Sequence, residues 1–209
     1  TAAAQQKVKA ITPGQADAPS GYATTLDPDG SPELCTGIQP LRLAKPPLAQ
    51  SGVAYDSTAQ SFVVRSLSYG TVEAAQAAYD YAAGLAAACD AQPLGADVPD
   101  QVWDITPDPT VVVPLAEQSV AAEYSTLGGA VSSTVLTIYT RVGDTIVQSS
   151  GSDRATTIYY AQLALSRATS QPAPLKVEPS GAVGDLAGGT AGTFVFNFDD
   201  TWRVSAGAN

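Results

Sequence analysis

Acidic side chains are the residues of this sequence whose type and spacing could do chemistry. Asp97, Asp100, Asp104 and Asp108 recur among prolines, and residues 199–200 are a second acidic pair. Two carboxyl groups can hydrolyse a glycosidic bond, one as general acid and the other as base or nucleophile. Acids in such loops are commonly solvated, and this chain lacks the size and groove usual for glycosidases. A carboxylate-dependent hydrolase is therefore the least favoured of three functional hypotheses.

Serine and cysteine nucleophiles lack the partners that catalysis requires. The chain contains no histidine, and it has neither a G-x-S-x-G nor an S-x-x-K motif. The usual serine hydrolase arrangements are therefore absent, and no imidazole is present to activate a cysteine. Without histidine, a zinc site of the usual kind is also excluded. The sequence predicts a non-enzymatic protein without a cofactor.

Two loop motifs resemble ion or phosphate sites without completing them. Residues 27–33 (DPDGSPE) place oxygen ligands around a tight glycine turn, as a calcium loop does. Two prolines and the wrong length break the calcium pattern and favour an ordinary Asp/Pro/Gly turn. Residues 188–190 (GGT) lack the lysine and the strand-to-helix context of a phosphate-binding loop. Neither motif predicts a binding site.

The two cysteines, Cys35 and Cys89, predict a structural disulfide. An even and minimal number of cysteines fits an oxidising compartment better than a metal site, which needs more ligands. Two inert buried thiols are the alternative. The bridge closes a loop of about 54 residues and stabilises the fold by about 4 kcal/mol in the chain-entropy model. It would fix a loose N-terminal arm on a helix.

That helix, over residues 72–90, is the clearest predicted element. Six of its residues recur at intervals of three and four and form one stripe: Val72, Ala75, Tyr79, Ala82, Ala86 and Cys89. Thr71 is the expected N-cap, and Pro93 stops the helix. Residues 61–69 (SFVVRSLSY) are β-branched and aromatic and predict a preceding strand.

The second half of the chain predicts a hairpin and another helix. Strands are expected over residues 120–125, 131–142 and 145–149, and Gly143 and Asp144 suit a type II′ turn between the last two. Asp153 is the expected cap of a helix over residues 154–169. One face of this helix is apolar and consists of Ile158, Ala161, Leu165 and Ala168.

Irregular structure is expected in the segments rich in proline, glycine and aspartate. These are an arm over residues 1–50 with one short helix, a loop over 94–114, and a linker over 171–192. A final strand over 193–198 has Phe194, Phe196 and Phe198 on one side. The order of elements predicts an α+β fold, a central antiparallel sheet flanked by helices, in a single domain over 1–209.

Aromatic residues could line a ligand cleft. Nine tyrosines exceed four phenylalanines, and two pairs lie on the predicted helices. Most such residues belong to the core edge or the surface, but rings of this kind also hold lipids or sugars. The residues of the possible cleft are Tyr79, Tyr81, Tyr159, Tyr160 and Trp103.

The net charge and the first residue of the sequence indicate which partners and which location to expect. Twenty acidic and ten basic residues give a net charge of −10, and the lysines are scattered, which argues against nucleic acid and anionic membrane surfaces as partners. No apolar stretch is long enough to span a bilayer. The start at Thr1 suggests removal of a signal peptide or an anchor. We therefore expect an extracytoplasmic location, at the cell surface or secreted, with membrane contact through a missing anchor.

Several stretches resemble a known family. They are Leu34-Cys35, the strand SFVVRSLSYG, the helix AAQAAYDYAAGLAAACD that ends in cysteine, and the later hairpin followed by an Ala-containing helix. Over residues 21–169 the chain resembles the actinobacterial extracellular sensor domains, which include the ectodomain of mycobacterial serine/threonine kinase H and related lipoproteins. The resemblance implies a central sheet with packed helices and a cleft for an unidentified ligand. Members usually hold two disulfides, whereas this chain can form one.

The leading hypothesis is a ligand-binding or sensor domain of a membrane-anchored lipoprotein or receptor in an actinobacterial cell envelope. Its expected partner is an unknown small molecule, lipid or glycan. The alternative is a protein-interaction or scaffolding module that pairs with an envelope protein through the strand carrying Phe194, Phe196 and Phe198.

Overall fold

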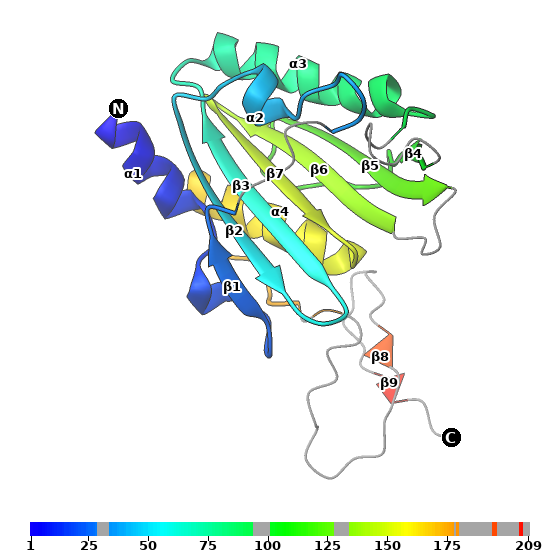
Figure 1. Cartoon of the computed structure of the whole chain (residues 1–209). Coiled ribbons are helices and arrows are strands. Elements are labelled where there is room, and N and C mark those ends of the chain that lie inside the picture. The colour runs from blue at the N-terminus through cyan, green and yellow to red at the C-terminus, as the bar shows by residue number, and fades with distance from the viewer. Residues whose placement is uncertain are drawn as a thin grey trace. The chain divides into compact units, whose positions relative to one another are not determined.

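The fold is described from a computed structural model. It describes residues 1–28, 34–93, 101–127, 134–177, 179, 194–195 and 205–206. The chain forms two compact units, Thr1–Pro179 and Ser180–Asn209 (Figure 1). In the second unit, the described residues are two short strands, β8 (Phe194–Val195) and β9 (Ser205–Ala206), which pair antiparallel.

The first unit is built on a seven-stranded antiparallel sheet with the order β1-β2-β3-β7-β6-β5-β4. The strands are β1 (Ala23–Leu26), β2 (Ala49–Asp56), β3 (Ser61–Ser68), β4 (Val102–Pro107), β5 (Gln118–Leu127), β6 (Thr134–Val142) and β7 (Thr145–Gly151). Pairing of β3 with β7 joins the two halves of the sheet, because Phe62 faces Gly151 and Ser68 faces Thr145.

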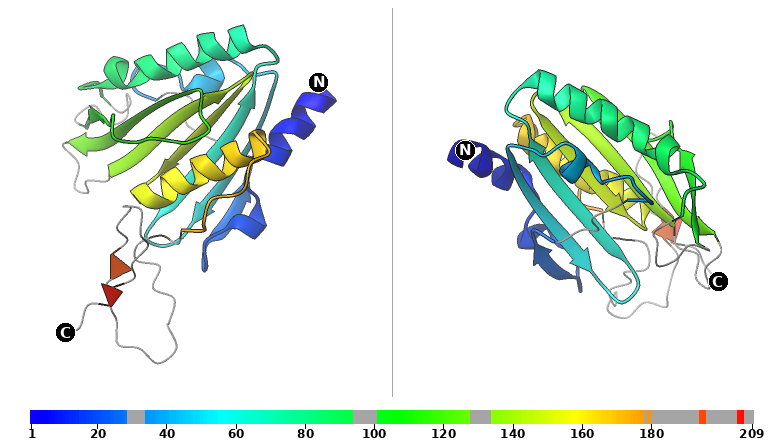
Figure 2. Two further views of the ribbon diagram at one scale, coloured as in Figure 1. Left: turned by 180° about the vertical axis from the view of Figure 1, so that it is seen from behind. Right: turned by 45° about the horizontal axis from the view of Figure 1, so that its top comes forward.

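Helices cover both faces of the sheet (Figure 2). One face carries α2 (Leu41–Ala44) and α3 (Val72–Cys89), and the other carries α1 (Ala2–Ile11), the 3-10 turn Gln15–Asp17 and α4 (Arg154–Ala168). Side chains alternate along a strand, so Phe62 and Val64 of β3 pack under α4 while Leu67 packs under α3. The predicted α+β fold with a central antiparallel sheet is confirmed.

The α3 helix agrees with its prediction in bounds and cap, and differs in its buried stripe. The Thr71 side chain accepts a hydrogen bond from the Ala74 amide, as an N-cap does. Val72, in the predicted stripe, is 49% exposed, whereas Ala78 and Leu85 are buried. Alanine repeats on several faces of this helix give little contrast, so the pattern alone could not choose between adjoining stripes.

The hairpin and α4 also follow the sequence. Gly143 adopts a φ of 55°, which glycine takes without strain, between β6 and β7. Asp153 accepts a hydrogen bond from the Thr156 amide at 2.9 Å and caps α4. Ala161 and Leu165 of the predicted apolar face are fully buried, and Ile158 and Ala168 are partly buried against the same core.

The segments predicted to be irregular are more ordered than expected. Within residues 1–50 lie α1, β1, α2 and the first residues of β2, and β4 lies inside the predicted loop 94–114. Gly52 and small polar residues weaken the strand pattern of β2, and pairing with β1 and β3 supplies what local preference lacks. Residues 171–177 have no regular structure, and most of the predicted linker and final strand lies outside the described residues.

No helix in the described ranges is both long enough and apolar enough to cross a membrane.

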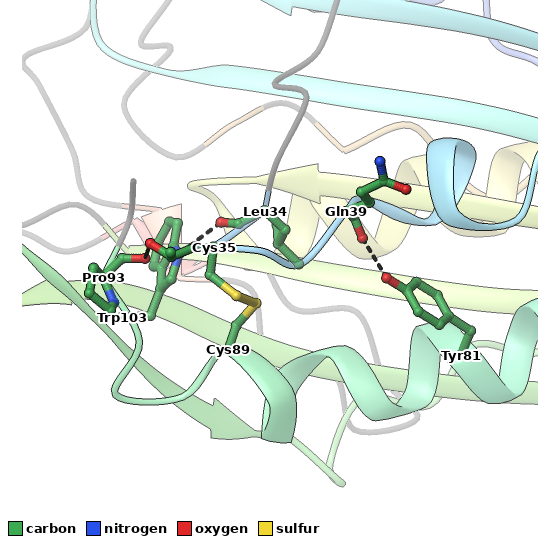
Figure 3. Close-up of a disulfide and its surroundings, with 8 residues drawn as sticks. Leu34, Cys35, Gln39, Tyr81, Cys89, Pro93 and Trp103 are labelled. Atoms are coloured by element: carbon green, nitrogen blue, oxygen red, sulfur yellow. Dashed lines mark hydrogen bonds between the residues drawn. A yellow bond between two sulfur atoms is a disulfide. The ribbon is translucent and has the colours of Figure 1, made fainter. Parts of the chain in front are cut away.

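The predicted disulfide between Cys35 and Cys89 is present (Figure 3). Both cysteines are fully buried, and their Cα atoms lie 5.7 Å apart, within the usual range. Two hydrogen bonds hold the same segment of chain, from Tyr81 Oη to the Gln39 carbonyl (2.7 Å) and from Trp103 Nε1 to the Leu34 carbonyl (3.0 Å). Residues 34–41 are thus tied to α3 and β4.

Removing this bond should weaken the whole first unit. We expect Cys35→Ala/Cys89→Ala to lower the free energy of unfolding by up to about 4 kcal/mol, because a reduced chain gains loop freedom when it unfolds. Urea unfolding of the variant and of the oxidised wild type measures the difference. Reductant should shift the wild type toward the variant and leave the variant unchanged. Equal midpoints for oxidised and reduced wild type would contradict the stabilising role.

Gly151 has no free space for a side chain. A Cβ there would collide with the Phe62 ring and lie 2.7 Å from Thr157 Oγ1, and Phe62 is 1% exposed, so it has little room to move. We expect Gly151→Ala to cost about 1–3 kcal/mol through overpacking. Gly84→Ala is the matched control: nothing lies within 4 Å of its Cβ on α3, and it should stabilise by about 0.5–1 kcal/mol. Thermal unfolding that ranks both variants alike would refute this packing.

Candidate functional site

The residues of the predicted aromatic cleft lie on opposite faces of the sheet. Tyr79 and Tyr81 belong to α3, and Tyr159 and Tyr160 belong to α4. The ring of Tyr160 stacks on Tyr55 with 4.9 Å between ring centroids, and its hydroxyl donates to the Asp17 carbonyl at 2.9 Å. Tyr159 is also buried. The sheet therefore separates the two pairs, and they do not line one cleft.

Trp103 lies beside the disulfide rather than beside these tyrosines. Its ring meets Tyr124 edge to face at 5.7 Å, in the small cluster that contains Cys35, Cys89 and Ile105. Because its Nε1–H donates to the Leu34 carbonyl, the indole has a structural role in holding the tied segment (Figure 3).

The candidate catalytic acids form no described pair. Asp97, Asp100 and residues 199–200 lie outside the described residues, and Asp104 is exposed. Asp108 is bound by Arg154 and by the Thr110 hydroxyl, and these hydrogen bonds, that from Arg154 most of all, lower its pKa to about 2. A carboxyl group with this pKa is ionised at neutral pH and suits an ion pair better than general acid catalysis.

The calcium-like motif can be followed only at its start. Asp27 and Pro28 are described, and residues 29–33 lie outside the described residues. Across the described ranges, no group of three or more acidic or cysteine side chains is placed to hold a metal ion.

A cavity of about 80 Å³ lies beside the end of β1. Its described lining residues come from the turn after β1, from α2, and from β2 and β3: Asp27, Pro28, Arg42, Gln50, Ser51, Gly52 and Arg65. We call this cavity the arginine pocket. Since Arg65 alternates with Val64, which packs under α4, its side chain lies on the face of the sheet that carries α2 and α3.

Gly52 makes room for Arg65. The two residues face each other across β2 and β3. A Cβ at Gly52 would lie 3.2 Å from Arg65 Cγ and 3.4 Å from Pro28 Cδ, so the arginine stem passes directly over the glycine. Asp27 fixes the adjoining turn, because its Oδ1 accepts a hydrogen bond from the Gly52 amide at 2.7 Å and its own amide donates to the Gly52 carbonyl at 2.7 Å.

Arg65 has no carboxylate partner among the described residues. Its Nη2 donates to the Pro28 carbonyl at 3.3 Å. Three other described arginines have carboxylates within 4 Å: Arg141 with Glu117, Arg154 with Asp108 and Glu123, and Arg167 with Asp17. Arg65 is partly buried, and burial of a cation without an opposite charge is unfavourable. It is therefore the arginine whose charge the described fold leaves unneutralised.

A second arginine adds to this unfavourable charge. Burial first, and then the positive charge of Arg42, lower the pKa of the Arg65 guanidinium below its usual value, while Tyr139 acts weakly the other way. Arg42 lies in α2 next to Leu41, which is 1% exposed and packs in the cluster under α3. The pocket is thus lined by two arginines, one from α2 and one from β3.

Another small cavity, of about 10 Å³, lies between α3 and the strands β5 and β6. A space of this size holds about one water molecule. The arginine pocket is larger and is lined by charged side chains, which makes it the candidate site.

Sequence reasoning did not select Arg42 or Arg65. One signal was present: Arg65 is a single cation inside an apolar strand, two residues before Leu67 and therefore on the same face. A charge on an apolar face requires a partner or a function. The contribution of Arg42 could not be read in this way, because α2 was not predicted.

Comparisons with known proteins give a distant structural likeness. No protein-family model matches the chain, and no curated protein matches it. Among solved structures, the chain is similar to the extracellular domain of PknH from Mycobacterium tuberculosis, with 10% sequence identity and a TM-score of 0.49 over 80% of this chain and 97% of that chain. Similarity at this level assigns no family, and the resemblance to sensor domains noted in the sequence stays a distant one.

If Arg65 is present for binding, the fold should not need its charge. We expect Arg65→Met, which keeps the stem over Gly52, to change the free energy of unfolding by less than about 0.5 kcal/mol or to raise it. Arg141→Met is the matched comparison and should cost about 2 kcal/mol, because it removes hydrogen bonds to Gln118 and to the Gly143 carbonyl and the ion pair with Glu117. Urea unfolding measures both. A loss at Arg65 equal to that at Arg141 would make Arg65 a structural residue.

Proposed function

We propose that this chain is a non-enzymatic extracytoplasmic binding or sensor domain that takes a small-molecule ligand in the arginine pocket. The carrying observation is Arg65, a partly buried cation that lines a cavity and has a backbone carbonyl as its described hydrogen-bond acceptor. Groups that are costly to bury and that converge on a cavity are the usual mark of a binding site.

The disulfide supports a location outside the cytoplasm. Structural disulfides persist in oxidising compartments and are rare in reducing ones. Here the bond is fully buried and ties residues 34–41 to α3, so it belongs to the folded state. Attachment to a cell envelope as a lipoprotein or receptor ectodomain extends the proposal, and its support is the sequence resemblance to actinobacterial sensor domains.

The chemistry of the lining supports binding rather than turnover. A guanidinium group keeps its proton at any physiological pH, so Arg42 and Arg65 can donate hydrogen bonds but cannot accept a proton. The described carboxylate of the lining, Asp27, already accepts a hydrogen bond from the Gly52 amide. Such a set of groups can orient a ligand and offers no evident general base.

The interaction module that was the alternative prediction has no described observation in its favour. Phe194 lies in β8, and residues 196–198 lie outside the described residues. Pairing through the Phe194, Phe196 and Phe198 edge stays a prediction.

Ligand binding can be tested without knowing the ligand. The oxidised, ¹⁵N-labelled chain is titrated with pools of sugars, amino acids, dicarboxylates, phosphate esters and fatty acids. At least one pool should shift the amides of Gln50, Gly52 and Arg65 in a saturable way, because these residues line the pocket. NMR chemical shifts report the position of binding directly.

Two variants separate pocket binding from other effects. Arg65→Met should weaken the ligand affinity measured from these shifts by about tenfold. This corresponds to the loss of about 1.4 kcal/mol expected for a charged hydrogen-bond partner. Gly84→Ala on α3, far along the chain from every lining residue, should leave them unchanged. Saturable shifts confined to residues around α4, or no saturable shift with any pool, would overturn the proposed function.

A further inference from the structure

We infer that the arginine pocket selects an oxyanion, the phosphate or carboxylate group of a small molecule. The inference rests on the proposed function and narrows it to a class of ligand. It follows from three features of the pocket: its unused hydrogen-bond donors, its local charge and its size.

The first feature is the supply of donors. A guanidinium group carries five N–H donors in a fixed plane, and Arg65 directs one described hydrogen bond to a protein acceptor, the Pro28 carbonyl. The remaining donors of Arg65 meet no acceptor in the described part of the chain. Two parallel N–H bonds to one oxyanion are the strongest use of such a fork. A neutral ligand would satisfy these donors less well, and a cation would satisfy none.

The second feature is local charge. Arg42 and Arg65 line the same cavity, and the positive charge of Arg42 makes the charged form of Arg65 less favourable. A bound anion turns this repulsion into attraction toward both groups. The overall charge of −10 does not prevent this, because exposed charges beyond about 8 Å are largely screened at physiological ionic strength. Asp27, the described acid of the lining, already accepts the Gly52 amide.

The third feature is size. The cavity has about 80 Å³, roughly half of the 150 Å³ in which an engineered cavity holds benzene. It therefore suits a group of a few heavy atoms, such as a phosphate or a carboxylate with a short stem. The remainder of a larger molecule would lie outside the pocket, so a phosphoryl headgroup and a free phosphate share the same contacts.

The test compares anions with neutral analogues of similar shape. Inorganic phosphate and succinate are titrated into the oxidised full chain, beside trimethyl phosphate and succinamide, at constant ionic strength. Calorimetry measures affinity, and the Nε–Hε NMR signal of Arg65, assigned by its loss in Arg65→Met, reports contact. We expect at least one anion to bind about tenfold or more tightly than its neutral analogue and to shift this signal. Phosphate against succinate decides between the two oxyanion sources.

Charge and fork geometry are separated by three variants. Arg65→Met should weaken anion binding by about tenfold or more, and Arg65→Lys should restore part of it, because lysine keeps the charge and loses the planar fork. Lys9→Met is the matched control: it removes the same charge from an exposed residue of α1, and it should leave affinity unchanged.

The outcomes are distinct. Neutral or cationic compounds that bind in the arginine pocket at least as tightly as the anions would overturn the oxyanion inference and leave the proposed function standing. Equal anion affinity in Arg65→Met and wild type would overturn it as well. Failure of every compound class to reach the pocket would overturn both.

Discussion

The Cys35–Cys89 bond determines where the chain between β1 and β2 can lie. In its described residues this segment forms the short helix α2, which is too brief to be stable by itself. The covalent tie, the hydrogen bonds from Tyr81 and Trp103, and the burial of Leu41 under α3 together fix it on the sheet. Arg42 follows Leu41 directly, so one wall of the arginine pocket depends on a bond formed some distance away. The disulfide and the arginine pocket therefore depend on the same segment of chain.

The other wall of the arginine pocket depends on the pairing of a long side chain, Arg65, with a glycine, Gly52. Gly52 leaves the space through which the Arg65 stem passes, and Asp27 closes the turn beside it with two hydrogen bonds to the same glycine. Arg141, Arg154 and Arg167 each have a carboxylate within 4 Å, which neutralises the charge of the guanidinium group. Arg65 lacks such a carboxylate in the described part of the molecule, and a residue kept at a cost to stability is a sign of function.

Local patterns in the sequence were sufficient where one element could be recognised alone. The caps at Thr71 and Asp153, the period of α3 and α4, and the glycine turn at Gly143 each predict a feature that the structure contains. Local patterns failed to predict strands whose formation depends on pairing with a neighbouring strand. The strand β2 contains Gly52 and small polar residues and has weak strand preference of its own, so its pairing with β1 and β3 supplies what local preference lacks. The strands β1 and β4 are short edge strands close to prolines, which predicted loops instead.

The aromatic cleft failed for a different reason. Helical periodicity places Tyr79 on the inner stripe of its helix, but it does not say which side of the sheet each helix covers. The same limit hid the candidate site, because Asp27, Arg42 and Arg65 come together only once β1, α2 and β3 are placed in space. Only the single cation in an apolar strand was visible beforehand.

The two halves of the sheet come from different parts of the sequence. Every described residue of the arginine pocket lies between positions 27 and 65, in the half built from β1, β2 and β3, whereas β4 to β7 and α4 come from later sequence and meet that half at the pairing of β3 with β7. Under the proposed function, the residues that bind the ligand would thus come from one contiguous stretch of sequence, and the remainder would support it. Ligand preference can diverge through changes within that stretch while the rest of the sheet keeps its sequence.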